Sequence, residues 1–259
     1  MIRRDAYLLA GPTASGKSAV AAMLARRMGA AILSADSMLV YRGMDVGTAK
    51  PSLAERAEFD MGGVDIVTPA EHFSSGAWLR AAARWLSATP AERPVLIVGG
   101  TGLYFSALLR GLDREWVQPP PAYPVLQLDR ALLHRRIAER LDMMLAGGEW
   151  FDEVRRLLAE YPEWSDTARV AIGYRELAGF LAEGRDPGGK DADPRFAALR
   201  EKILVRTRQL AKRQETWFRH QSSALGVQVE ETTVATAANV GRVWEKHGPW
   251  QVCLPGEDE

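Results

Sequence analysis

The residues best suited to chemistry lie near the start of the chain, in the segment Gly11-Pro12-Thr13-Ala14-Ser15-Gly16-Lys17-Ser18. Glycines allow backbone amides to crowd around a phosphate chain, Lys17 adds a full positive charge, and the Ser18 hydroxyl can hold a magnesium ion. An apolar run at residues 6–10 precedes this segment, and residues 19–28 are rich in helix formers. Strand, glycine-rich turn and helix in this order are typical of the phosphate-binding P-loop of ATP-binding and other nucleotide-binding proteins; an ordinary glycine turn is the alternative.

Three further polar residues follow predicted buried strands. Asp36, Thr101 and Arg130 come after the apolar runs at residues 30–35, 94–98 and 125–128, respectively. Because ligands bind at the carboxyl ends of the strands in open α/β sheets, we expect all three to meet the phosphate loop at one edge. Lys17, Ser18 and Arg130 would bind a phosphate group, while Thr101 would donate a hydrogen bond. This set suits a reaction that holds a phosphate or pyrophosphate while a nucleophile loses a proton to Asp36. Asp36 alone fits a helix cap or a magnesium ligand equally well.

The elements that must position these residues alternate between apolar strands and helical patterns. This alternation predicts an α/β fold: a P-loop NTPase-like, mostly parallel sheet flanked by helices, with a helical C-terminal part. We expect a P-loop α/β core at residues 1–145, a helical part packed on it at 146–225, and an edge strand, helix and tail at 226–259. Helices are predicted at residues 73–88, 130–145, 149–160, 171–182, 195–219 and 234–246, and short strands at 64–67 and 227–230.

The strand at residues 94–98 ends in Gly99-Gly100-Thr101, where a nucleoside triphosphatase usually has a magnesium-binding aspartate. This difference argues against an ordinary ATPase. Composition excludes other classes. The 259 residues have no net charge and a single cysteine, Cys253, which excludes a disulfide framework and fits a reducing compartment. No apolar run approaches the ~20 residues of a membrane helix, and we expect residues 1–10 to form a first strand and not a signal peptide.

The predicted helix at residues 195–219 is locally basic. From residue 200 to residue 219 it carries seven basic and two acidic residues, with Trp217 and Phe218 close to its end. Such a surface could bind an RNA backbone. A solvated helix whose arginines lie along its surface is the alternative. Arg135, Arg136, Glu139 and Arg140 lie mostly off the apolar stripe of the helix at 130–145, and for them we expect a solvated face.

Several longer segments together point to one family. The matching segments are residues 11–18, 34–37, 40–51, 98–104, 107–112, 136–140 with 144–145, 171–177 and 207–218. Residues 40–51, for example, read Val-Tyr-Arg-Gly-Met-Asp-Val-Gly-Thr-Ala-Lys-Pro, and residues 98–104 read Val-Gly-Gly-Thr-Gly-Leu-Tyr. In this order, over about residues 6–220, the chain resembles the tRNA dimethylallyltransferases, or isopentenyl-tRNA transferases.

The resemblance implies a cytoplasmic tRNA-modifying prenyltransferase. Such enzymes move a dimethylallyl group from dimethylallyl pyrophosphate to the exocyclic amine of an adenosine beside the anticodon. Asp36 matches the general base, and Thr101 and Arg130 match catalytic residues that assist with the pyrophosphate. The phosphate loop, residues 11–18, would bind that pyrophosphate with Mg²⁺ on Ser18, in place of ATP. Contacts to the tRNA anticodon arm are implied for Asp36, Ser37, Met38, Leu39, Gly173, Tyr174, Arg175, Arg208, Lys212 and Arg213. We expect a monomer without a membrane partner.

One departure from the family leaves the acceptor open. Family members carry a helical insertion domain between the segments that match Leu112 and Val125, where this chain has only a proline-rich connection at about residues 112–124. The adenylate isopentenyltransferases, which prenylate free adenine nucleotides, also lack the insertion and are the main alternative. A small-molecule P-loop kinase that uses ATP is a third reading. A non-catalytic RNA-binding remnant is a fourth, against which the intact Lys17, Ser18, Asp36 and Thr101 argue.

Overall fold

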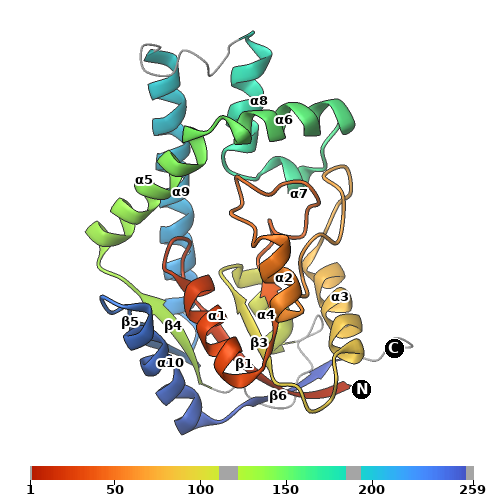
Figure 1. Ribbon diagram of the computed structural model, residues 1–259, viewed down its shortest axis with the longest axis vertical. Helices are drawn as coiled ribbons and strands as arrows, with labels where there is room; N and C mark the ends of the chain where they lie inside the picture. The colour runs from red at the N-terminus through yellow and green to blue at the C-terminus, as the bar shows by residue number, and fades with distance from the viewer. Residues whose placement is uncertain (1, 111–121, 185–193, 255–259) are drawn as a thin grey trace.

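The computed structural model of the chain describes residues 2–110, 122–184 and 194–254 (Figure 1). In this part, five strands form a parallel sheet in the order β2-β3-β1-β4-β5, and β6 pairs antiparallel with the first half of β1. The strands are β1 (Ile2–Ala10), β2 (Ala31–Ala35), β3 (Val95–Gly99), β4 (Tyr123–Gln127), β5 (Ala224–Gln228) and β6 (Trp250–Leu254). The predicted α/β fold with a mostly parallel sheet is confirmed.

The apolar runs form central strands because helices cover both faces of the sheet. All residues of β2 and β3 are buried, as expected for parallel strands between two helical layers. Residues of α1 (Lys17–Met28) and α10 (Thr233–His247) pack on one face. Residues of α3 (Ser75–Ala88) and α4 (Gly102–Arg110) pack on the other. The loops at the carboxyl ends of the strands are therefore the part of the sheet left open to ligands.

Five helices between β4 and β5 form a helical part that lies above the sheet in Figure 1. They are α5 (Arg130–Ala146), α6 (Glu149–Glu160), α7 (Asp166–Arg169), α8 (Tyr174–Ala182) and α9 (Pro194–Arg219). The long helix α9 runs from the top of the molecule down to the sheet (Figure 1). One hydrophobic cluster contains Ala10 and Ile97 of the sheet together with Trp150 and Phe218 of these helices. The helical part therefore packs directly on the sheet, while the boundaries near residues 145 and 225 stay a prediction.

Local sequence signals located several helix starts and missed others. Ser74 and Asp129 accept backbone amides as the N-caps of α3 and α5. The helix α2 (Leu53–Phe59), which begins at a capping box formed by Ser52 and Glu55, was not predicted, and neither were α7 and β6. The predicted strand at residues 64–67 is wrong. Asp65 has a left-handed backbone with φ of 53°, which interrupts an extended strand.

The predicted site of the missing insertion, residues 112–124, lies mostly outside the described residues, and only its end is visible as the start of β4. The predicted tail at residues 255–259 also lies outside them. Among the helices of the described ranges, none is long and apolar enough to cross a membrane.

Candidate active site at the carboxyl edge of the sheet

The phosphate loop connects β1 to α1 and has a backbone suited to anions. Gly11, Ala14 and Gly16 have positive φ angles of 153°, 61° and 90°. The left-handed conformation is unusual for alanine, and such strain concentrates at ligand-binding loops. Gly16 caps α1 without a side-chain hydrogen bond, and the first turn of α1 has no acidic residue. The first backbone amides of α1 are therefore available to an anion, which the helix dipole also favours.

Lys17 and Ser15 add polar side chains to this loop. The Lys17 ammonium donates to the Pro12 carbonyl at 2.7 Å. Burial lowers the pKa of Lys17 from 10.5 to about 8, while the charge of Asp36 opposes this shift and the charge of Arg140 adds to it. The Ser15 hydroxyl is buried and has no hydrogen-bond partner within the described residues. An oxygen of a bound phosphate group would supply that partner.

The neighbouring ends of β2 and β3 bring Asp36 and Thr101 together, as the sequence predicts. The Thr101 hydroxyl accepts the backbone amide of Ser37 at 2.9 Å and donates to the Ser37 hydroxyl at 3.3 Å. The Asp36 carboxylate accepts the amide of Met38 at 2.9 Å, and its side chain remains partly exposed. Asp36 also acts on the pKa of Lys17, so the carboxylate lies within electrostatic range of the phosphate loop. A carboxylate, a hydroxyl and an ammonium group therefore share one edge of the sheet.

The turn after β3 has a steric reason to begin with glycine. A Cβ atom on Gly99 would lie 2.1 Å from the carbonyl oxygen of Ala35 in the neighbouring strand. Any side chain at this position would collide with backbone atoms that cannot yield. An aspartate at this position, one of those where an ATPase could place its magnesium ligand, therefore has no room in this fold.

Helix α5 supplies two arginines that the sequence analysis expected in solvent. The Arg136 guanidinium lies 3.8 Å from the position that a Cβ on Gly16 would occupy. Arg140 donates to the Thr48 carbonyl at 3.2 Å, and burial lowers its pKa while the charge of Asp36 opposes that shift. The expectation of a solvated face is therefore wrong for Arg140, whereas Arg136 is partly exposed and reaches the phosphate loop. Their spacing of four places both on one side of the helix, and this spacing was the available signal.

Arg130 lies elsewhere on α5. It is exposed at the start of the helix and lines a groove of about 240 Å³ between α5 and α9. Arg208 and Lys212 of α9 line the same groove, and the buried Nε of Arg208 has no hydrogen-bond partner within the described residues. Three cationic residues therefore line one groove, beside the start of α5 that follows β4. This arrangement suits an anion but does not by itself assign one.

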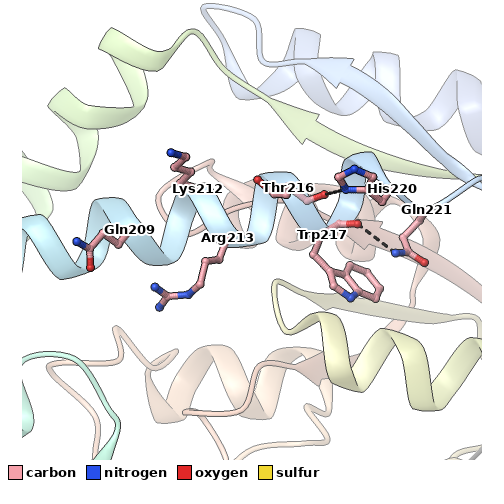
Figure 2. Close-up of a pocket in the computed structure, with 7 residues that line it drawn as sticks. All are labelled: Gln209, Lys212, Arg213, Thr216, Trp217, His220 and Gln221. Atoms are coloured by element: carbon pink, nitrogen blue, oxygen red, sulfur yellow. Dashed lines mark hydrogen bonds between the residues drawn. The ribbon is translucent and has the colours of Figure 1, made fainter.

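A second groove, of about 610 Å³, lies along the C-terminal half of α9 and shares Gln209 and Lys212 with the first (Figure 2). It is lined by Gln209, Lys212, Arg213, Thr216, Trp217, His220 and Gln221. Figure 2 shows Arg213 and Trp217 on the side of the helix that faces α4, with Lys212 and His220 on the opposite side. Arg200 and Arg206 of the same helix are paired with Asp142 and Glu176. The basic surface predicted for this helix is therefore narrower than its sequence suggests.

The predicted RNA contacts differ in exposure. Gly173 and Tyr174 are buried, and the Tyr174 hydroxyl donates to Glu153 at 2.5 Å. The Tyr174 side chain fills the space between Trp150 and Trp164, so in this structure it cannot contact RNA. Of this trio Arg175 is exposed, as are Lys212 and Arg213, while Ser37, Met38 and Leu39 are partly exposed beside Asp36.

Glu153, a residue that sequence reasoning missed, anchors the loop at residues 42–51. Its buried carboxylate accepts the backbone amides of Asp45 and Val46, both at 2.9 Å, in addition to the Tyr174 hydroxyl. The buried ammonium of Lys50 adds ion pairs to Asp45 and Asp65, both at 2.6 Å. These contacts hold the loop against α6 and α8. The loop in turn presents the Thr48 carbonyl that Arg140 binds.

The described side chains offer a divalent metal one simple position. No group of three or more histidine, cysteine, aspartate or glutamate residues is arranged to hold a metal in the described part of the chain. Ser18, in the first turn of α1, is exposed next to the phosphate loop. Magnesium commonly keeps several waters and binds one protein oxygen together with substrate phosphates. Ser18 therefore fits Mg²⁺ that arrives with a phosphorylated substrate.

Sequence comparisons relate this chain to isopentenyl and dimethylallyl transferases. The sequence profile of a family described as IPP transferase matches residues 39–123 and 114–221, and one described as isopentenyl transferase matches residues 4–60. A tRNA dimethylallyltransferase from Thiobacillus denitrificans is 38% identical over 286 residues, covering 83% of this chain and 88% of that protein. A protein of the same name from Aromatoleum aromaticum is 36% identical over 288 residues, with 83% and 87% covered.

Solved structures share the fold at lower sequence identity. A tRNA delta(2)-isopentenylpyrophosphate transferase from Staphylococcus epidermidis is 24% identical with a TM-score of 0.79, and the match covers 94% of this chain and 100% of that one. A tRNA isopentenylpyrophosphate transferase from Bacillus halodurans is 22% identical with a TM-score of 0.77, covering 94% and 97%. The P-loop-like sheet with its helical C-terminal part is therefore the fold of these structures.

Proposed function

Because the chain belongs to the IPP transferase family, we propose that it transfers a dimethylallyl group from dimethylallyl pyrophosphate to the exocyclic amine of an adenosine beside the tRNA anticodon. The observation that carries this proposal is the meeting of Lys17, Asp36 and Thr101 at one edge of the sheet. The same edge receives Arg136 and Arg140 from α5. This site can bind a pyrophosphate and accept a proton, which are the two tasks of the reaction.

The phosphate loop would bind the pyrophosphate of the donor. The amides at the start of α1, the unpartnered Ser15 hydroxyl and the Lys17 ammonium supply its contacts. Arg136 and Arg140 add positive charge from α5. As the allylic carbon–oxygen bond breaks, its electron pair passes to the leaving pyrophosphate, so these cations stabilise the transition state more than the ground state. The exposed Arg130 remains a proposed contributor to the same charge.

Ser18 is the residue that would hold Mg²⁺ beside the donor. A bound magnesium ion would neutralise part of the charge on the departing pyrophosphate. The exposed hydroxyl at the start of α1 and the absence of a carboxylate cluster in the described ranges fit an ion that binds mainly to substrate oxygens.

Asp36 would act on the acceptor. An adenine amine is a poor nucleophile, so loss of its proton to a carboxylate assists formation of the new carbon–nitrogen bond. The Asp36 side chain is partly exposed, and the hydrogen bond from the Met38 amide orients its carboxylate. Ser37 directly follows Asp36, and Thr101 holds it in place through hydrogen bonds with the Ser37 backbone amide and hydroxyl. The target adenosine must leave its stack to reach this pocket.

We propose that the acceptor is the anticodon arm of tRNA, which would place the reaction in the cytoplasm. The exposed Lys212 and Arg213, which line the same groove as Trp217, support RNA binding, because a free nucleotide needs no such extended surface. The chain would act without the insertion domain of its relatives. The alignment with the Thiobacillus protein is 286 positions long, but it contains only 83% of this chain, which is about 215 of its 259 residues. At the remaining positions the Thiobacillus protein has residues that this chain lacks. Fewer phosphate contacts predict modest tRNA affinity and a shallow dependence on salt.

Incubation with labelled dimethylallyl pyrophosphate and Mg²⁺, with either total tRNA or AMP as the acceptor, tests the proposal. Label in the tRNA is the expected result. Label in AMP alone would show prenylation of free adenylate, the alternative that the missing insertion favours. Label in neither acceptor, combined with tight ATP binding in calorimetry, would instead indicate a P-loop kinase.

A further inference from the structure

Gln214 of α9 joins two segments of the site that are far apart in the sequence. Its carbonyl oxygen accepts the backbone amide of Thr13 at 2.8 Å. Its amide nitrogen donates to the carbonyl of Gly100 at 3.0 Å. Because both ends of the carboxamide are used, its orientation is determined by these partners. A single side chain therefore connects the phosphate loop to the turn that carries Thr101.

The turn after β3 is shaped to admit this side chain. A Cβ atom on Gly100 would lie 2.6 Å from the Gln214 amide nitrogen, and a Cβ on Gly102 would lie 2.5 Å from the Trp217 ring. On its other side, the amide of Thr101 donates to the Ala35 carbonyl at 3.2 Å. Thr101 is therefore held between α9 and β2. The glycines on either side of it are the residues that allow α9 to approach.

The same helix carries the groove proposed for RNA. Arg213 directly precedes Gln214, and Trp217 follows it by one turn; both line the larger groove (Figure 2). The backbone position of this helical turn thus determines both where the groove lies and where the carboxamide reaches. One helix that reaches both the proposed donor site and the proposed RNA groove is a direct physical connection between them.

We propose that Gln214 is a positioning residue that fixes the phosphate loop and Thr101 in the geometry needed to bind the prenyl donor, and thereby joins the RNA-binding helix to the donor site. This inference rests on the proposed function. It assigns no proton transfer or bond change to Gln214, which acts through the Thr13 amide and the Gly100 carbonyl. Loss of both hydrogen bonds, one of them to a loop that must order around an anion, should weaken donor binding roughly 10- to 100-fold.

The test replaces Gln214 with methionine, which has similar length but lacks both hydrogen-bonding groups. Calorimetry would measure binding of dimethylallyl pyrophosphate with Mg²⁺, and steady-state assays would give the KM of donor and tRNA separately. We expect a higher donor KM with an unchanged tRNA KM, which general loosening of the helix would not produce. Gln228→Met is the matched control, since Gln228 is an exposed glutamine on the edge strand β5 that contacts Gln127.

A double-mutant cycle with Gly100→Ala tests the mechanism itself. The added methyl group should displace the Gln214 carboxamide, so Gly100→Ala should weaken donor binding on its own. A Cβ on Gly100 would also lie 3.0 Å from the Gly11 carbonyl of the phosphate loop, so part of its effect is independent of Gln214. The double variant should therefore lose less affinity than the sum of the two single effects, because both changes disrupt the same Gln214 contact. Fully additive effects would overturn the inference, as would donor binding by Gln214→Met within twofold of the parent.

Failure of the role of Gln214 can be distinguished from failure of the proposed function. If Gln214→Met does not fold, Gln214→Glu replaces it, because a carboxylate can still accept the Thr13 amide but cannot donate to Gly100; unchanged donor affinity in that variant would overturn the proposal. If the unsubstituted protein binds no dimethylallyl pyrophosphate, the proposed function fails. If it binds the donor and the variants bind equally well, only the role of Gln214 fails.

Discussion

Replacing Arg140 with methionine should weaken binding of dimethylallyl pyrophosphate about 10- to 100-fold. The guanidinium reaches from α5 to the Thr48 carbonyl and lies close enough to Lys17 to lower the pKa of that lysine. A hydrogen bond to a charged partner contributes about 1.5–3 kcal/mol, and each 1.4 kcal/mol is about tenfold in affinity. Methionine keeps most of the aliphatic volume, so the loss should appear in donor affinity more than in stability.

The substitution should also change the pH dependence of donor binding. In the unsubstituted protein Lys17 has a pKa of about 8, so it loses its charge as the pH rises through that value, and affinity for the anionic donor falls. The positive charge of Arg140 contributes to the lowering of this pKa. Removing that charge raises the pKa of Lys17, so the decline in donor affinity should move to higher pH.

Calorimetry with the donor and Mg²⁺ at several values of pH between 6 and about 10 would measure both effects. Arg135→Met is the matched control, because Arg135 lies on the same helix, is 68% exposed and pairs with Glu139 at 3.9 Å. The control should bind the donor as the unsubstituted protein does. Arg140→Met with donor affinity within twofold of that control, or with an unmoved pH profile, would refute the assignment of Arg140 to the donor site.

Three further predictions address other parts of the site. Asp36→Asn should leave folding and donor binding nearly unchanged but lower turnover by roughly two to four orders of magnitude; loss of donor affinity at unchanged turnover would make Asp36 a metal-site residue. Glu153→Gln should lower the free energy of unfolding by about 1.5–3 kcal/mol, because a buried charged acceptor of three hydrogen bonds becomes neutral, and an unchanged melting temperature would contradict this. Neutralising Arg208, Lys212 and Arg213 together should raise the KM for tRNA and leave calorimetric donor binding unchanged; equal use of tRNA would exclude this surface as the RNA site.

The phosphate loop, Asp36 and Thr101 could be found from the sequence because each depends on a local pattern. Glycines between a strand and a helix specify an anion-binding turn wherever they occur. Residues that directly follow parallel strands must meet at one edge, so the strand pattern alone brought Asp36 and Thr101 to the loop. The fold class followed from the same alternation of strands and helices.

The sequence could not reveal which basic and polar side chains of the helical part turn inward. Arg140 bonds a carbonyl 92 residues away, Glu153 bonds an amide 108 residues away, and Gln214 bonds an amide 201 residues away. Helical periodicity separates an apolar stripe from its opposite face, but it does not say whether a residue beside the stripe meets solvent or another element. Tyr174 shows the converse, since a residue expected at an RNA surface is buried between two tryptophans.

The sequence by itself therefore determined the P-loop, the parallel sheet and the catalytic candidates at its edge, because these follow from short-range patterns and strand connectivity. Only the tertiary structure decided that Arg136 and Arg140 face the phosphate loop, that Glu153 anchors the loop at residues 42–51, and that Gln214 connects α9 to Thr13 and Gly100. The physical reason is that these contacts depend on how helices pack over the sheet. That packing is a collective property of the buried core, which no single segment specifies.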